Sequence, residues 1–149
     1  MASTLANLLY HVVFSTKNRR DSISDEIRDD LHRYMGGIIK GENGILLEIG
    51  GTPDHVHLVL KLKPVHTLSD MMRKLKGGSS KWMNENNKTR ERFTWQDGYG
   101  AFSVSRSQLE HVRQYVKEQE EHHRTFSFRY EYIRLLELHG VEYNDDFLW

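Results

Sequence analysis

The sequence predicts an α+β fold built on one four-stranded antiparallel sheet. Four short runs are rich in apolar and β-branched residues, as strands are, and apolar residues recur at helical spacing in the segments around them. The order along the chain is strand, helix, strand, strand, helix, strand, and two more helices follow. This is the split βαβ pattern, ferredoxin-like or RRM-like, and we expect the helices of the pattern on one face of the sheet. At 149 residues the chain is expected to form one domain, residues 1–149.

Three of the four predicted strands lie in the first half of the chain. Residues 5–15 (LANLLYHVVFS) are expected to form the first strand, and Ser24 can cap the helix that follows. Residues 45–49 form the second strand, and the Gly-Gly and Pro-Asp pairs after it predict a hairpin. Residues 55–63 (HVHLVLKLK) give the clearest strand signal, because apolar and polar side chains alternate almost strictly.

The second half of the chain is predicted to be mainly helical. At two places a serine or threonine is followed three residues later by an acidic residue. This is the spacing of a capping box, which marks the start of a helix. The expected elements are a helix after Thr67 (paired with Asp70), a strand at 99–104, a helix at 108–122 after Ser107 (paired with Glu110), and a last helix from Ser127 to Gly140.

Composition excludes several classes of protein. The chain has no cysteine, which excludes a disulfide framework, a zinc–cysteine site and a thiol nucleophile. It has no run of about 18 apolar residues and no N-terminal segment typical of a signal peptide, so neither a membrane protein nor a secreted one is expected. We expect a cytoplasmic protein.

Charge is segregated along the chain although the formal net charge is zero. The 21 basic and 21 acidic side chains argue against a uniformly cationic nucleic-acid binder. Residues 61–92, however, hold nine basic and three acidic side chains, whereas residues 110–149 hold five and nine. An isolated basic run is usually a solvated helix face, so its surroundings must decide what it does.

His55 and His57 lie two residues apart on the clearest predicted strand. This spacing puts both imidazoles on one face, roughly 7 Å apart along the strand. Two histidines so placed can present nitrogen atoms to one metal ion. An ordinary polar face with two histidines would show the same pattern.

Tyr115 and Gln119 lie four residues apart in the predicted helix at 108–122, so they share one helical face. The apolar stripe of this helix is offset from them, so the tyrosine need not be part of the core. A tyrosine at the boundary of the core, with its ring packed and its hydroxyl wetted, fits the pattern equally well.

The His-x-His strand followed by the Tyr-x-x-x-Gln helix resembles the single-tyrosine HUH transposases of minimal bacterial insertion sequences, the insertion-sequence-200-like family. Further blocks resemble that family in its own order and extend the resemblance over almost the whole chain. They are YHVVFSTKNRR at 10–20, GTPDHVHLVL at 51–60, WQDGYGAFSVS at 95–105, YVKEQEEHHRTFSFRYEY at 115–132 and the tail HGVEYNDDFLW.

The resemblance implies roles for four residues. Tyr115 would be the catalytic nucleophile, attacking a DNA phosphodiester to give a 5′-phosphotyrosine and a free 3′-OH. His55, His57 and Gln119 would be metal ligands, with Mg²⁺ or Mn²⁺ as cofactor; ligand chemistry alone favours Mn²⁺ for this neutral set. No nucleotide cofactor is expected, because the covalent link conserves the phosphodiester energy and the chain has no P-loop pattern.

The resemblance also implies partners. The substrate would be single-stranded DNA folded into a hairpin at the ends of an insertion sequence, and the protein would be nucleoid-associated when bound to it. The family works as a homodimer with composite active sites, in which the histidine pair of one subunit meets the tyrosine helix of the other. Because the basic run directly follows the histidine pair, we expect it to contact DNA; the expected contacts are Lys61, Lys63, Arg73, Lys74, Lys76 and Lys81.

Three other functions fit parts of the pattern. A domesticated relative acting on repetitive palindromes and a rolling-circle replication nuclease would share the chemistry, although the compact length and the order of the blocks favour a transposase. A non-catalytic, RRM-type module that binds single-stranded nucleic acid would need exposed aromatic residues on its sheet face, where this sequence places histidine and lysine.

Overall fold

The computed structural model describes residues 3–86 and 88–149 and contains the predicted α+β fold. One antiparallel sheet has the strand order β2-β3-β1-β4. The strands are β1 (Leu8–Ser15), β2 (Ile45–Thr52), β3 (His55–Leu62) and β4 (Gly100–Val104). The helices are α1 (Asp25–Gly41), α2 (Leu68–Glu85), α3 (Leu109–Lys117), α4 (Gln119–His122) and α5 (Phe128–Leu138), with short 3-10 turns η1 (Lys17–Arg19), η2 (Arg106–Gln108) and η3 (Asp145–Phe147).

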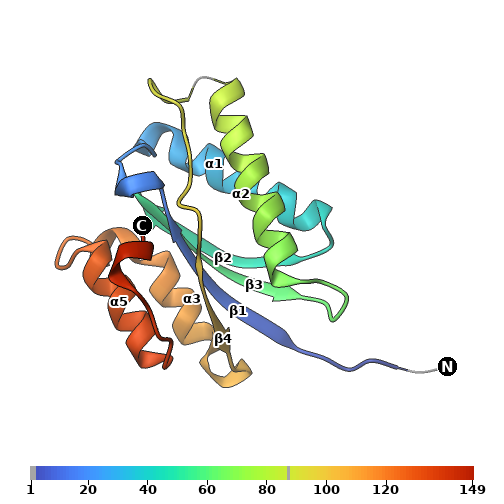
Figure 1. Cartoon of the computed structure of the whole chain (residues 1–149). Helices are drawn as coiled ribbons and strands as arrows, with labels where there is room; N and C mark the ends of the chain where they lie inside the picture. The colour runs from blue at the N-terminus through green and yellow to red at the C-terminus, as the bar shows by residue number, and fades with distance from the viewer. Residues whose placement is uncertain (1–2, 87) are drawn as a thin grey trace.

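The two helices of the split βαβ pattern lie on one face of the sheet, as predicted (Figure 1). Alternate residues of β3, beginning with Val56 and Leu58, point into this layer and are fully buried. They meet the apolar stripes of α1 and α2, which include Met35 and Leu75. This face therefore forms the main apolar core, and it contributes stability through burial of hydrocarbon.

The C-terminal helices cover the opposite face of the sheet, which the sequence pattern left unassigned (Figure 1). Val59 of β3 packs against Leu109 and Val116 of α3, and Val13 of β1 packs against α5. Both faces of the sheet are thus buried beneath helices. His55 and His57 share the face of Val59, so they lie beneath α3, α4 and α5.

The predicted helix at 108–122 is broken in the structure. It begins as the 3-10 turn η2, continues as α3, and is interrupted at Glu118 before α4 begins at Gln119. The capping box expected at Ser107 is wrong, because this residue lies inside η2 and its hydroxyl contacts that of Ser105 at 3.1 Å. The caps predicted at Thr67 and Ser127 are present, since each side chain accepts a hydrogen bond from a backbone N–H three residues later.

A glycine allows α3 to approach the sheet closely. A Cβ atom at Gly50 of β2 would collide with the backbone carbonyl group of Val116 in α3. The C-terminal end of α3 therefore rests directly on β2, beside the start of β3 across the hairpin. This contact fixes the height of Tyr115 above the histidine pair. In the described part of the chain, no helix combines the length and the apolar character needed to cross a membrane.

Candidate active site and metal centre

The histidine pair is buried, which rules out an exposed polar face. His55 and His57 have no exposed surface, and their ring centroids lie 5.2 Å apart. Nδ1 of His55 contacts residues of the β2–β3 turn, Nδ1 of His57 contacts the neighbouring strand β1, and both rings direct Nε2 toward the C-terminal helices. Because burying polar nitrogen atoms is costly unless they are partnered, these contacts hold the rings in one orientation.

The orientation of His55 is fixed from the β2–β3 turn. Its Nδ1 lies 2.7 Å from a carboxylate oxygen of Asp54 and 2.9 Å from the hydroxyl of Thr52. Burial raises the pKa of Asp54, but the hydrogen bond and the charge of His55 outweigh burial and lower this pKa below its usual value. An ionised carboxylate can only accept, so Nδ1 of His55 carries a proton and donates it to the hydrogen bond with Asp54. Histidines that bind metal are commonly oriented by such a carboxylate.

The orientation of His57 is fixed by a third histidine on the neighbouring strand. Nδ1 of His57 lies 2.8 Å from Nε2 of His11, which is buried on β1. Burial, followed by the proximity of His57, lowers the pKa of His11 to about 3, so His11 is neutral at neutral pH. A neutral imidazole can accept one hydrogen bond, so His11 can accept from Nδ1 of His57, and the other nitrogen of His57 is directed at the site.

Glu131 of α5 is a buried carboxylate at the centre of the cluster, and it is 2% exposed. Its Oε1 lies 2.8 Å from Nε2 of His57 and 3.0 Å from Nε2 of His123. Its Oε2 accepts hydrogen bonds from the Tyr115 hydroxyl and, at 3.0 Å, from the Gln119 amide. Burial raises the pKa of Glu131, but His57 and His123 lower it well below its usual range, so the group is ionised.

The cluster could hold a metal ion. His55, His57, His123 and Glu131 each offer one ligand atom, and these atoms all lie within 4.8 Å of one another. The carbonyl oxygen of Gln119 joins them, 2.9 Å from Nε2 of His55 and 3.1 Å from Nε2 of His123. Imidazole nitrogen and carboxylate oxygen together are typical ligands of transition-metal ions. The donor set thus fits a divalent ion.

The four site residues expected from the sequence meet at this cluster, and two others were missed. His123 lies four residues after Gln119, so the helical spacing that linked Tyr115 to Gln119 could have included it. Glu131 is a charged residue on the buried side of α5, next to Tyr132 in the apolar stripe. Its placement over β3 depends on the packing of α5 across the sheet, which the sequence pattern did not reveal.

Tyr115 is half buried, and its hydroxyl points into the cluster. The hydroxyl donates to Glu131, and the ring stacks on His122 with centroids 4.7 Å apart. Burial and the negative charge of Glu131 raise the pKa of Tyr115 far above its ordinary value, so the phenol holds its proton in this state. A tyrosine so placed needs a nearby proton acceptor before it can act as a nucleophile.

The basic residues expected to contact DNA are divided between the two faces of the sheet. Lys61 is on the site face of β3, and Lys63 is exposed just after this strand. The other four belong to α2, on the opposite face, and each has a local partner. Arg73 pairs with Asp70, Lys74 with Asp70 and Glu42, and Lys81 with Glu85, while Lys76 donates to backbone carbonyls.

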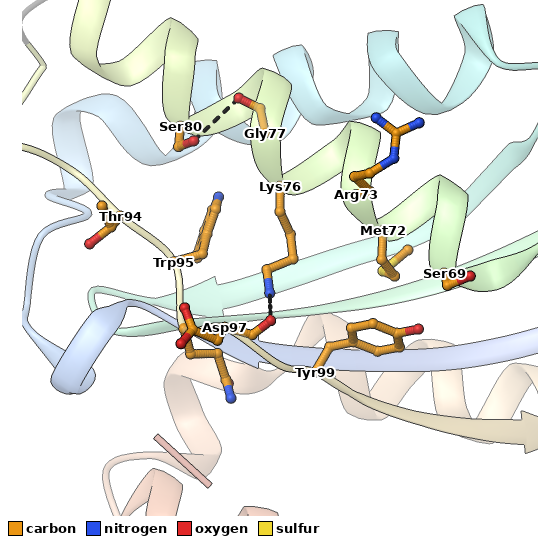
Figure 2. Close-up of a pocket in the computed structure, with 11 residues that line it drawn as sticks. Ser69, Met72, Arg73, Lys76, Gly77, Ser80, Thr94, Trp95, Asp97 and Tyr99 are labelled. Atoms are coloured by element: carbon orange, nitrogen blue, oxygen red, sulfur yellow. Dashed lines mark hydrogen bonds between the residues drawn. The ribbon is translucent and has the colours of Figure 1, made fainter. Parts of the chain in front are cut away.

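A pocket of about 430 Å³ separates α2 from the segment that leads to β4 (Figure 2). Lys76 crosses this pocket and donates to the carbonyl of Asp97 at 3.1 Å. Arg73 and Tyr99 line the same pocket, which lies across the sheet from the histidine pair. The structure thus does not bring the α2 cations to the candidate metal site, and DNA contact by them stays a prediction.

Known proteins resemble this chain over most of its length. Residues 4–119 match the family model described as "Transposase IS200 like". The transposase of insertion sequence element IS200 from Salmonella typhimurium is 31% identical over 124 residues, which are 80% of this chain and 81% of that protein. The ISDra2 transposase TnpA of Deinococcus radiodurans is 27% identical over 118 residues, 75% of this chain and 84% of that protein.

Solved structures agree with the fold. A crystal structure of a protein described as a transposase from Deinococcus radiodurans R1 has a TM-score of 0.64 at 27% identity, covering 80% of this chain and 95% of that one. A REP-associated tyrosine transposase bound to a REP hairpin has a TM-score of 0.55 at 14% identity, covering 78% and 70%, and shows the fold alone. The resemblance drawn from the sequence is confirmed: the chain belongs to the IS200-like transposase family.

Proposed function

We propose that this transposase cuts and rejoins single-stranded DNA at the hairpin ends of an insertion sequence, through a 5′-phosphotyrosine at Tyr115. The observation that carries the proposal is the convergence of the Tyr115 hydroxyl and the nitrogens of His55 and His57 on one buried carboxylate, Glu131. This convergence provides a nucleophile, a proton acceptor and a metal-binding cluster in a single site.

The two oxygens of Glu131 suggest two roles. Oε2 accepts the hydrogen bond of Tyr115, so it is placed to take the phenol proton as the tyrosyl oxygen attacks phosphorus. Oε1 faces His57 and His123, on the side where the candidate metal ligands gather. Attack forms the tyrosyl–phosphorus bond, breaks the bond from phosphorus to the 3′ oxygen, and leaves a 3′-OH. The reverse attack by a DNA 3′-OH rejoins a strand and frees Tyr115.

The cofactor we propose is Mg²⁺ or Mn²⁺, held by His55, His57 and Gln119, with His123 and Glu131 as additional candidate ligands. A bound divalent ion would polarise the scissile phosphate and stabilise the leaving oxygen. Two imidazoles, or three if His123 also binds, favour Mn²⁺ over Mg²⁺, which prefers oxygen ligands.

We propose a homodimer with composite sites, as the family resemblance implies. The single chain already holds its own tyrosine beside its own histidine pair. Exchange between subunits would require the helix of Tyr115 to move, and residues 124–127 between α4 and α5 could allow this. Mixing Tyr115→Phe protein with His57→Ala protein tests the arrangement. If the sites are composite, the mixture regains cleavage. If the mixture stays inactive, each site lies within one chain.

A non-catalytic RRM-type binder is disfavoured by the covering of the sheet. Such modules bind single strands on an exposed sheet face with aromatic residues. Here one face is covered by α1 and α2 and the other by the C-terminal helices. A domesticated relative acting on repetitive palindromes would use the same site, and the DNA that flanks the gene distinguishes the two.

The decisive test is the covalent adduct. Single-stranded oligonucleotides carrying the palindrome that flanks the gene are incubated with protein and Mn²⁺ or Mg²⁺, and the adduct is resolved on a denaturing gel. We expect Tyr115→Phe to form no adduct while binding the DNA with unchanged affinity. An adduct that persists in this variant would refute the role of Tyr115.

A further inference from the structure

A second feature of the C-terminal helices is a cavity of about 400 Å³ beside the proposed nucleophile. Its size falls in the range of pockets that bind small ligands, roughly 300–1,000 Å³. The residues that form it come from the continuous stretch 115–138, so the cavity belongs to the same segment as Tyr115. The residues that matter to the argument are Tyr115, His122, Phe126, Tyr130 and Arg134.

Aromatic rings form the wall of this cavity. Tyr115 stacks on His122 at 4.7 Å between centroids, and His122 is followed by Phe126 at 6.0 Å with the two rings 27° from parallel. Phe126 in turn contacts Tyr130 at 5.8 Å, and Tyr130 is 54% exposed. A row of rings that reaches from solvent to the nucleophile offers a surface on which an unpaired base can stack.

One buried polar atom in the cavity wall lacks a partner. Nε2 of His122 is buried and has no hydrogen-bond partner within the described residues. A buried unsatisfied nitrogen is costly, and such an atom in a native structure calls for a bound group that would satisfy it. The edge of a nucleobase carries both donors and acceptors, so it could pair with this nitrogen in either tautomer.

Arg134 supplies positive charge at the same place. Its guanidinium donates to the Tyr130 hydroxyl at 3.3 Å. Two other arginines of the C-terminal helices pair with carboxylates, Arg113 with Glu110 and Arg129 with Asp145. Among the described residues Arg134 forms no such ion pair. It also lines a second cavity, of about 370 Å³, which Tyr115 lines as well, so this cation borders both cavities beside the nucleophile.

Building on the proposed function, we propose that this cavity is the subsite for the nucleotide next to the scissile phosphate of single-stranded DNA. The base stacks on the ring of Phe126 and pairs through its edge with Nε2 of His122. Arg134 binds the adjoining phosphate, a contact suited to the planar guanidinium. Stacking tolerates every base, so the subsite positions the strand for attack more than it reads the sequence.

The test compares normal DNA with DNA that lacks single bases. Oligonucleotides carrying the flanking palindrome receive an abasic site at each position on either side of the cleavage point, and affinity is measured with Tyr115→Phe protein, which keeps the ring but cannot cleave. We expect one of the two adjacent abasic sites to weaken binding about 5- to 100-fold. In a Tyr115→Phe, Phe126→Leu double variant the normal DNA should bind more weakly and the abasic penalty should largely vanish.

Matched controls separate the subsite from general damage. Phe147 is 82% exposed and lies outside the cavity, so Phe147→Leu in the same background should keep the full abasic penalty. In the Arg134→Gln variant, affinity should depend less steeply on salt concentration, because about one counterion fewer is released when the DNA binds. His122→Phe keeps a ring without the nitrogen, and it should retain stacking while changing the preference among the four bases.

The outcomes distinguish this inference from the proposed function. Normal cleavage and adduct formation with no abasic penalty at either position would overturn the subsite alone, as would a penalty that Phe126→Leu leaves unchanged. Failure of wild-type protein to form any adduct would overturn the proposed function. The binding measurement with Tyr115→Phe protein still decides whether a base occupies the cavity.

Discussion

The two faces of the sheet are formed by the same strands but have different roles. On the α1/α2 face, β3 presents Val56 and Leu58 to a dry apolar core. On the α3–α5 face, the intervening residues His55 and His57 enter a buried network of imidazoles, an amide and a carboxylate. Alternation along one strand therefore separates residues that stabilise the fold from residues that form the site, because neighbouring side chains point to opposite faces.

The largest effect on function is expected from the site face. His57→Ala removes a candidate ligand and one of the partners of Glu131, and it leaves Nε2 of His11 without its hydrogen-bond partner. Changes to the outer partners of metal ligands alone cost roughly 10- to 100-fold, so we expect metal-dependent cleavage to fall more than about 100-fold. Adduct formation is followed over time with Mn²⁺ at several concentrations. Near-normal cleavage at every concentration would show that this face does not hold the catalytic metal.

The neighbouring residue on the opposite face should affect stability instead. Leu58→Ala leaves a cavity in the main core, where such changes cost about 2–5 kcal/mol in the free energy of unfolding. Urea denaturation measures this loss. We expect the folded molecules of the Leu58→Ala variant to cleave DNA at the wild-type rate. Folded His57→Ala molecules, in contrast, should cleave more slowly than the wild type. A Leu58→Ala protein with normal stability and impaired cleavage would invert the assignment of the two faces.

Much of this division could be predicted from the sequence. Alternation along residues 55–63 separated the two histidines from the apolar residues, and four-residue spacing linked Tyr115 to Gln119. These are local signals, set by the geometry of a strand and of a helix. Glu131 was missed because its role depends on how α5 crosses the sheet, which involves contacts distant in sequence. The basic run was expected beside the site because it follows β3 directly, yet α2 packs on the other face.

Acid should destabilise the protein through the site face. His11 has a pKa of about 3 in the folded protein and about 6.5 when unfolded, so the unfolded state binds more protons between these values. Stability should therefore fall as the pH drops from 6.5 toward 3, by up to about 1.4 kcal/mol per pH unit for this group. His11→Phe keeps a ring but cannot titrate. Its unfolding free energy, measured in a chelator, should start lower than the wild-type value and depend less steeply on pH in that window. An unchanged slope would assign acid sensitivity to other groups.

The smallest expected effect concerns which face meets DNA. Lys61 shares the site face of β3 and has no ion pair among the described residues, whereas Lys81 of α2 lies on the other side of the sheet and pairs with Glu85. For single-stranded DNA, each phosphate contact by a lysine contributes about 0.7 to the slope of the logarithm of affinity against the logarithm of salt concentration. We expect Lys61→Ala to lower this slope by about that amount and Lys81→Ala to leave it unchanged, as measured by fluorescence anisotropy over a salt series. The opposite result would place the strand along α2. Tyr115 would then be separated from its phosphate by the sheet and could reach it only if the tyrosine helix moved.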